Sequence, residues 1–165
     1  MTKKYNSVLI IGMGLIGSSI SRALVENHVA NSVYGLDTND KIIKKCHDLN
    51  LLVQGETNLN NFDLQFDLII ICTPLSAYKN IFSSLSDFIS QPTLITDVGS
   101  TKMSTISDFK EVVTNNNITF VPSHPIAGLE KSGPEYGFSK LFDNRYCILT
   151  PYETNDAATF SISEM

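Results

Sequence analysis

One segment near the N-terminus constrains the fold most, because an apolar run passes directly into regularly spaced glycines. Residues 7–17 read SVLIIGMGLIG, so Gly12, Gly14 and Gly17 form a G-x-G-x-x-G pattern between an expected strand and an expected helix. The first glycine permits a tight turn, the second lets the backbone approach a pyrophosphate, and the third allows the helix to pack closely on the strand. The segment therefore predicts a dinucleotide-binding turn; the alternative is a glycine-rich turn without a ligand.

The start of the expected helix strengthens this interpretation. A helix N-terminus offers free N–H groups and a partial positive charge, both of which attract phosphate groups. Leu15 and Ile16 open the helix directly after the second glycine. We therefore expect them to belong to the same cofactor site.

An aspartate follows the glycines at the sequence spacing expected of a ribose-binding residue. Asp37 lies 20 residues after Gly17, at the end of the second expected strand, where an acidic side chain accepts hydrogen bonds from an adenosine ribose. A carboxylate there repels a 2′-phosphate, and no arginine follows nearby, so NAD is favoured over NADP. The alternative role for Asp37 is to cap a helix that begins near Asp40, a role that Asn39 could also fill.

The rest of the chain alternates short apolar runs with helically patterned segments, which is typical of β-α-β winding. The 165 residues suit a single domain. We predict an α/β fold of the Rossmann type, with a doubly wound, mainly parallel sheet and helices on both faces. The expected strands are 7–11, 32–36, 51–53, 67–72, 93–98, 118–121 and 145–149. The expected helices are 15–27, 40–49, 74–88 and 101–114.

Two segments lack such a pattern. Residues 122–137 hold three prolines and three glycines without periodicity, which predicts a loop of functional length. Beyond Pro151 no core-forming period is visible. We therefore expect an NAD-binding domain at residues 1–151 and a short tail at 152–165.

Polar residues follow several expected strands, at the edge where parallel sheets bind ligands. Cys72, Thr73 and Pro74 end one strand and are candidate cofactor contacts, with Cys72 read as a small core residue rather than a nucleophile. Ser100 follows another strand, where it could serve the site or cap the next helix. His124 lies after a third strand, and its imidazole could accept the proton of an alcohol during oxidation. A histidine with a purely structural role is the alternative.

Composition excludes several other classes of function. Twelve basic and 17 acidic side chains give a net charge of −5, and Arg22 and Arg145 are the only arginines, so a nucleic-acid partner is not expected. Glycines interrupt the N-terminal apolar run, which is far shorter than the roughly 20 residues that a membrane-spanning helix needs. Three scattered cysteines match neither a disulfide framework nor a metal site. We expect a cytoplasmic protein without metal that acts on a small molecule.

Several motifs together resemble one family. GMGLIGSS, DVGSTK and above all SHPIAGLEKSGPEYGF followed by LFDNRYCILTP look like the nucleotide-binding domain of prephenate dehydrogenases, including cyclohexadienyl and arogenate dehydrogenases of tyrosine biosynthesis. The resemblance covers roughly residues 8–151. It implies hydride transfer from the hydroxyl-bearing ring carbon to NAD or NADP, with loss of a carboxylate as the ring becomes aromatic.

The resemblance also implies roles for single residues. His124 would be the base that binds the ring hydroxyl, and Ser100 would contact both this hydroxyl and the nicotinamide. Gly128 and Glu130 would lie on the substrate side, with Glu130 at the mouth of the site. Leu129 departs from the small polar residue that several members have there.

Members of the family continue into a helical domain that dimerises and supplies cationic side chains for the substrate carboxylates. That C-terminal helical domain is absent from this sequence, so residues 152–165 would be only its start. The homodimer is expected for full-length members. One alternative is therefore an NAD-binding module without turnover. Another is a β-hydroxyacid-type dehydrogenase, which would use a lysine on a downstream helical domain; the HPIAG segment argues against it.

Overall fold

The computed structural model describes residues 4–153 and 155–165, and its centre is a parallel sheet. Within these residues six strands pair in the order β3-β2-β1-β4-β5-β6, every neighbouring pair parallel. The chain winds outward from β1 to β3 and then returns to β4 on the other side of β1. The predicted Rossmann-type, doubly wound sheet is confirmed, and its switch point lies between β1 and β4. The strands are β1 (Tyr5–Ile11), β2 (Ala30–Leu36), β3 (Gln54–Glu56), β4 (Leu68–Ile71), β5 (Thr93–Asp97) and β6 (Ile118–Val121).

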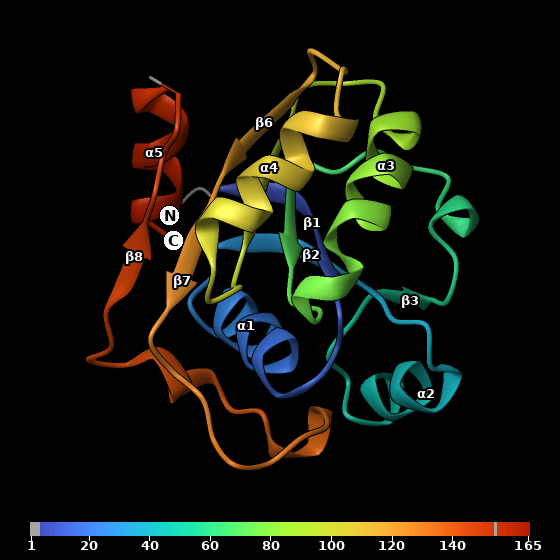
Figure 1. Cartoon of the computed structure of the whole chain (residues 1–165). Helices are drawn as coiled ribbons and strands as arrows, with labels where there is room; N and C mark the ends of the chain where they lie inside the picture. The colour runs from blue at the N-terminus through green and yellow to red at the C-terminus, as the bar shows by residue number, and fades with distance from the viewer. Residues whose placement is uncertain (1–3, 154) are drawn as a thin grey trace.

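Helices cover both faces of the sheet (Figure 1). Because side chains alternate along a strand, Val8 and Ile10 join the cluster beneath α1 and α2, whereas Leu9 and Ile11 join the cluster beneath α3 and α4. Burial of both faces explains why β1 and β4 read as continuous apolar runs rather than as alternating ones. The helices are α1 (Leu15–Glu26), α2 (Asp40–Asp48), α3 (Tyr78–Phe88), α4 (Lys102–Val112) and α5 (Asp156–Ser163). No helix in these ranges combines the length and apolar character needed to cross a membrane.

The strand expected at residues 51–53 is misplaced. Leu51 is buried in the core as part of the connection, and the strand β3 follows it, with Gly55 opposite Gly35 of β2. This edge strand is polar and only half-buried. The strand was therefore predicted at the apolar residues of the preceding connection and not at its true position.

The loop expected at residues 122–137 contains a strand. β7 (Ser123–Pro125) pairs antiparallel with β8 (Cys147–Leu149), and the two form a small separate sheet. The strand expected at 145–149 therefore exists, but outside the main sheet. A three-residue strand that contains a histidine and a proline lacks the apolar run that would predict it, and proline is tolerated because this pair has a free edge.

The expectation that nothing beyond Pro151 forms part of the core is wrong. Residues Asp156–Ser163 form α5, which contacts β6 at the edge of the main sheet, and Ile162 is buried in the same cluster as α1. Tyr5 in β1 also lies within hydrogen-bond distance of Ser161, with 2.8 Å between their hydroxyl oxygens. One buried side chain in eight residues is too weak a signal for sequence analysis.

Candidate functional site

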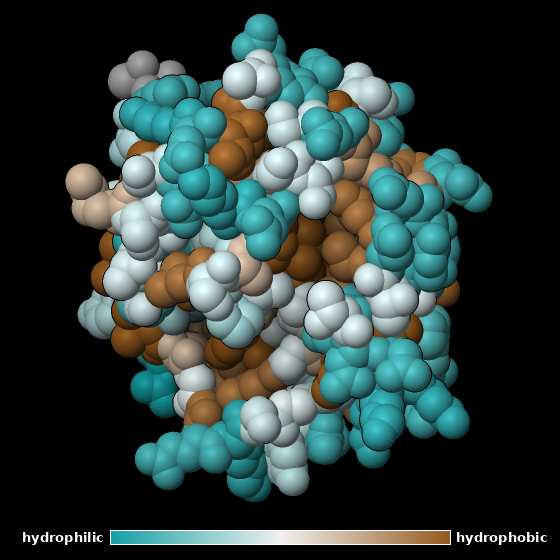
Figure 2. Space-filling view, turned by 45° about the vertical axis from the view of Figure 1, so that its right-hand side comes forward, coloured by the Kyte–Doolittle hydropathy of each residue, from teal (hydrophilic) through white to brown (hydrophobic). Residues whose placement is uncertain are grey.

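The carboxyl ends of β1, β2 and β4 surround a cavity of about 810 Å³. Six of the predicted cofactor residues line it: Gly12, Gly14, Asp37, Cys72, Thr73 and Pro74. The molecular face in Figure 2 is hollowed near its middle, where hydrophobic side chains are visible between hydrophilic ones. The cavity thus lies at the switch point, where open α/β sheets bind ligands.

Each of the three glycines meets different surroundings. Gly12 has φ +93°, and a Cβ there would lie 2.8 Å from the backbone of Cys72. At Gly17 a Cβ would lie 2.1 Å from the carbonyl oxygen of Gly12, which is closer than atoms can approach. At Gly14, the N-cap of α1, a Cβ would have no neighbour within 4 Å among the residues that the structure describes. Gly12 and Gly17 therefore shape the turn, and Gly14 leaves open space over the helix N-terminus.

Asp37 ties this turn to the end of β2. Its Oδ2 accepts a hydrogen bond from the N–H of Met13 at 2.9 Å, and its Oδ1 accepts one from the N–H of Asn39 at 3.0 Å. Asn39 is the N-cap of α2, because its side chain accepts a hydrogen bond from the N–H of Lys41. The alternative role of Asp37 as the side-chain cap of α2 is therefore taken by Asn39, and the half-buried carboxylate lines the cavity.

Thr73 carries an unusual hydroxyl. Among the described residues its Oγ1 is buried without a hydrogen-bond partner, although Thr73 lines the cavity. A buried hydroxyl without a partner is costly, so a ligand with polar groups fits this wall of the cavity. Burial, and secondarily the charge of Asp97, raise the pKa of the neighbouring Cys72 thiol, which disfavours the thiolate that a nucleophile needs.

Other predicted cofactor residues contribute less directly. Leu15 is buried and Ile16 packs against the core, so neither side chain lines the cavity and only their backbone N–H groups could serve a phosphate. Conversely, sequence analysis missed several residues that line the cavity, among them Thr38, Asn58, Asn60, Asn80 and Ile81. Asn58 lies just past the end of β3, and this position could have indicated a place in the site. The strand was expected at residues 51–53 instead, so the position of Asn58 was not recognised.

The predicted catalytic and substrate residues lie elsewhere on the same edge. Ser100 follows β5 and is exposed, and His124 is half-buried in β7, opposite Ile148 of β8. Gly128 and Glu130 are exposed in the loop that follows. None of these four residues lines the cavity. Ser100 does not cap α4 either, because the N-cap residue is Thr101, whose hydroxyl pairs with Ser104.

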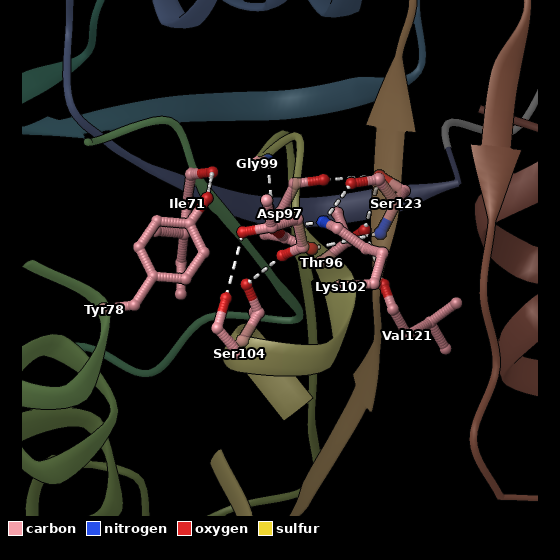
Figure 3. A network of polar contacts seen from close by, with 11 residues as sticks. Ile71, Tyr78, Thr96, Asp97, Gly99, Lys102, Ser104, Val121 and Ser123 are labelled. Atoms are coloured by element: carbon pink, nitrogen blue, oxygen red, sulfur yellow. Dashed lines mark hydrogen bonds and ion pairs between the residues drawn. The ribbon is translucent and has the colours of Figure 1, made fainter. Parts of the chain in front are cut away.

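A buried polar network around Asp97 connects Gly99, which precedes Ser100, with Ser123, which precedes His124; Figure 3 shows Asp97, Gly99 and Ser123. Asp97, the last residue of β5, is fully buried and forms an ion pair with Lys102 of α4 at 2.5 Å. Burial lowers the pKa of Lys102, and the hydrogen bond and charge of Asp97 oppose this shift. Asp97 also accepts hydrogen bonds from the N–H groups of Gly99 and Ser123. Sequence analysis noted the DVGSTK segment but not this network.

Comparison with known proteins identifies relatives of one kind. Residues 20–164 match the family described as prephenate dehydrogenase, nucleotide-binding domain. The chain is 33% identical over 147 residues to a cyclohexadienyl dehydrogenase of Zymomonas mobilis, covering 89% of this chain and 50% of that protein. It is 32% identical to a prephenate dehydrogenase of Bacillus subtilis, covering 94% of this chain and 42% of the relative. The chain thus spans half or less of the length of these curated relatives.

Solved structures agree with this result. A prephenate dehydrogenase from Aquifex aeolicus, in complex with hydroxyphenyl propionate and NAD⁺, has a TM-score of 0.87 and 31% identity, covering 96% of this chain and 55% of that one. A 3-hydroxyisobutyrate dehydrogenase from Salmonella typhimurium has a TM-score of 0.71 at 12% identity, covering 96% of this chain and 51% of that one, and so shares the fold alone.

Proposed function

The chain belongs to the prephenate dehydrogenase family, as its nucleotide-binding domain, and on this basis we propose that it binds NAD for the oxidative decarboxylation of prephenate or arogenate in tyrosine biosynthesis. The observation that carries the proposal is the cavity at the switch point. It combines open space at Gly14, the carboxylate of Asp37 and the unpartnered hydroxyl of Thr73. These features suit the pyrophosphate, the ribose and the polar groups of a dinucleotide.

Within this proposal, the first part of the chain holds the cofactor. Gly12, Gly14 and Gly17 shape the turn, and the backbone N–H groups at the start of α1 face the phosphates. Asp37 accepts hydrogen bonds from the adenosine ribose, which favours NAD because a 2′-phosphate beside this carboxylate would be repelled. NAD, when bound, supplies the hydride acceptor.

His124 and Ser100 act on the substrate. In this proposal the half-buried imidazole of His124 accepts the proton of the ring hydroxyl. Ser100 contacts this hydroxyl from the end of β5, and Gly128 and Glu130 border the substrate from the following loop. Loss of carbon dioxide then leaves an aromatic ring.

One observation favours a second candidate, an NAD-binding module without turnover of its own. Large apolar side chains near His124 are exposed: Ile126, Leu129, Tyr146 and Ile148. A family member would cover such side chains with the helical domain that also binds the substrate carboxylates. The division into an NAD-binding domain at 1–151 and the start of a helical domain at 152–165, the homodimer and the cytoplasmic location all stay predictions.

The test is the appearance of NADH when the purified chain receives NAD and prephenate, with arogenate in a parallel sample. Turnover with either substrate supports the dehydrogenase. NAD binding without turnover supports the module. A folded chain that neither binds NAD nor turns over contradicts both candidates.

A further inference from the structure

We propose that Asp97 is a positioning residue, whose buried carboxylate holds the segments of Ser100 and His124 in one arrangement. The inference rests on the proposed function for the roles of these two residues. Its structural basis is independent of that function, because it concerns the backbone on either side of the carboxylate.

The two oxygens of Asp97 serve different segments. Oδ2 accepts a hydrogen bond from the N–H of Gly99 at 3.0 Å, and Oδ1 accepts one from the N–H of Ser123 at 3.1 Å. Gly99 directly precedes Ser100, and Ser123 directly precedes His124. A single side chain therefore fixes the backbone next to both proposed reacting residues (Figure 3).

Lys102 completes the hold on the histidine segment. Its ammonium group donates to Oδ2 of Asp97 at 2.5 Å and to the carbonyl oxygen of Ser123 at 2.6 Å. The hydroxyl of Ser123 also donates to the carbonyl oxygen of Asp97 at 2.5 Å. The N–H, carbonyl and hydroxyl groups of Ser123 thus all form hydrogen bonds. The backbone that leads into His124 is therefore fixed in position.

The segment before Ser100 is equally confined. A Cβ at Gly99 would lie 2.6 Å from the side chain of Leu75 and 2.9 Å from Oδ2 of Asp97. The N–H of Gly99 can approach the carboxylate only because this residue has no side chain. The turn that leads to Ser100 therefore packs tightly against the carboxylate of Asp97.

Stability alone is a poor reason for such a network. Apolar residues of similar volume often replace a buried ion pair without loss of stability. Only an ionised carboxylate accepts bonds from two backbone N–H groups and an ammonium group at once, because an amide would turn a donor toward one of them. The geometry therefore favours a role in aligning the two segments.

The first variant to test is Asp97→Asn combined with Lys102→Met, which removes both buried charges together. Amide hydrogen exchange, followed by NMR in the full chain, should accelerate about tenfold at Gly99 and Ser123, the effect of losing one hydrogen bond each. The ring signals of His124 should shift, while the amides of β1 and β4 and the affinity for NAD stay as in the wild type. Where the wild type turns over, kcat should fall at least about tenfold with an unchanged KM for NAD.

Asp67→Asn is the matched control. The carboxylate of Asp67 accepts hydrogen bonds from the N–H groups of Asn6 and Ser7, at the opposite edge of the sheet. This variant should change exchange at those two amides and leave Gly99, Ser123 and turnover unaffected.

Asp97→Glu provides a second test should the double variant fail to fold. Glutamate keeps the charge opposite Lys102 but displaces the oxygens by one methylene, so the same two amides should exchange faster. Unchanged exchange at both amides in Asp97→Glu, or a uniform rise across the sheet in the double variant, would overturn the proposal. A wild-type chain without turnover would count against the proposed dehydrogenase activity. The positioning role of Asp97 would then be decided by the hydrogen-exchange experiment alone.

Discussion

The two halves of the sheet's carboxyl edge are built in different ways. Residues that follow β1, β2 and β4 line a cavity of about 810 Å³, and Gly12 and Gly17 occupy positions that admit no side chain. Beyond β5 and β6, Ser100 is exposed, His124 is half-buried, and only the backbone beside them is held, by Asp97. We call these the cofactor half and the histidine half.

Under the proposed function, this difference assigns NAD binding to the cofactor half and turnover to the histidine half. The cofactor half encloses its ligand space within the described chain, so changes there should alter NAD binding. In the histidine half, Ser100 and His124 do not line that cavity, and the backbone beside them is aligned by Asp97. Changes there should alter turnover and leave NAD binding intact.

The largest expected effect comes from His124→Asn in the histidine half. Asparagine retains a hydrogen-bonding side chain but cannot take a proton, so turnover should fall by roughly two to four decades. Steady-state kinetics and NAD titration of the same sample measure both quantities. A collapse of NAD binding would instead assign His124 a structural role and remove the distinction between the halves.

Dense packing of α2 on the sheet beside the cofactor half predicts sensitivity to alkali. Burial, more than neighbouring charges, raises the pKa of the Cys46 thiol from its ordinary value of 9.0 to about 11. The unfolded chain then loses the proton first, so the free energy of unfolding should fall between pH 9 and 11, by at most about 2–3 kcal/mol.

Chemical denaturation at pH 8 and pH 11 measures this loss. Cys46→Ala should reduce it, whereas Cys147→Ala, at an exposed position in the histidine half, should change it less. Equal pH dependence in the wild type and Cys46→Ala would show that the thiol is not the titrating group.

Two glycines sharpen the comparison within the cofactor half. Gly14→Ala adds a methyl group where no atom of residues 4–153 or 155–165 lies within 4 Å, so the fold should persist while NAD affinity falls about tenfold or more. Gly17→Ala should instead lower the unfolding midpoint, because its Cβ collides with the Gly12 carbonyl. Gly128→Ala is the matched control for NAD affinity and the unfolding midpoint, because a Cβ at Gly128 also has open space among the described residues. Wild-type affinity in Gly14→Ala would place the phosphates elsewhere.

The smallest effect concerns cofactor choice. Asp37→Ala should weaken NAD binding by about tenfold or less and NADP binding by a smaller factor, because the repulsion of a 2′-phosphate disappears with the carboxylate. Asp40→Ala, at an exposed position in the first turn of α2, serves as the control. Titrations with both cofactors decide the matter, and equal losses would exclude Asp37 from the ribose.

Sequence analysis singled out six residues that line the cavity of the cofactor half because the signals there are local. The apolar run of β1, the glycine spacing and Asp37 lie within about thirty residues, and each follows directly from strand or turn geometry. The cavity-lining asparagine Asn58 was missed because the polar strand β3 gave no hydrophobic pattern.

The histidine half was harder to predict because its structure depends on distant contacts. Asp97 and Ser123 lie 26 residues apart, and no pattern within either segment reveals that they bond. The pairing of β7 with β8 likewise joins residues such as Ser123 and Leu149, which are far apart in the sequence. His124 and Ser100 are proposed from their position after strands and from resemblance, whereas the contacts of Asp97 beside them required the structure.

Calorimetric titration of the 165-residue chain with NAD tests most directly whether the cofactor half is a complete site. Saturable binding of one NAD per chain is expected in the wild type and in His124→Asn, with much weaker binding in Gly14→Ala. No binding by a folded wild-type chain, or equal binding in Gly14→Ala, would contradict this account.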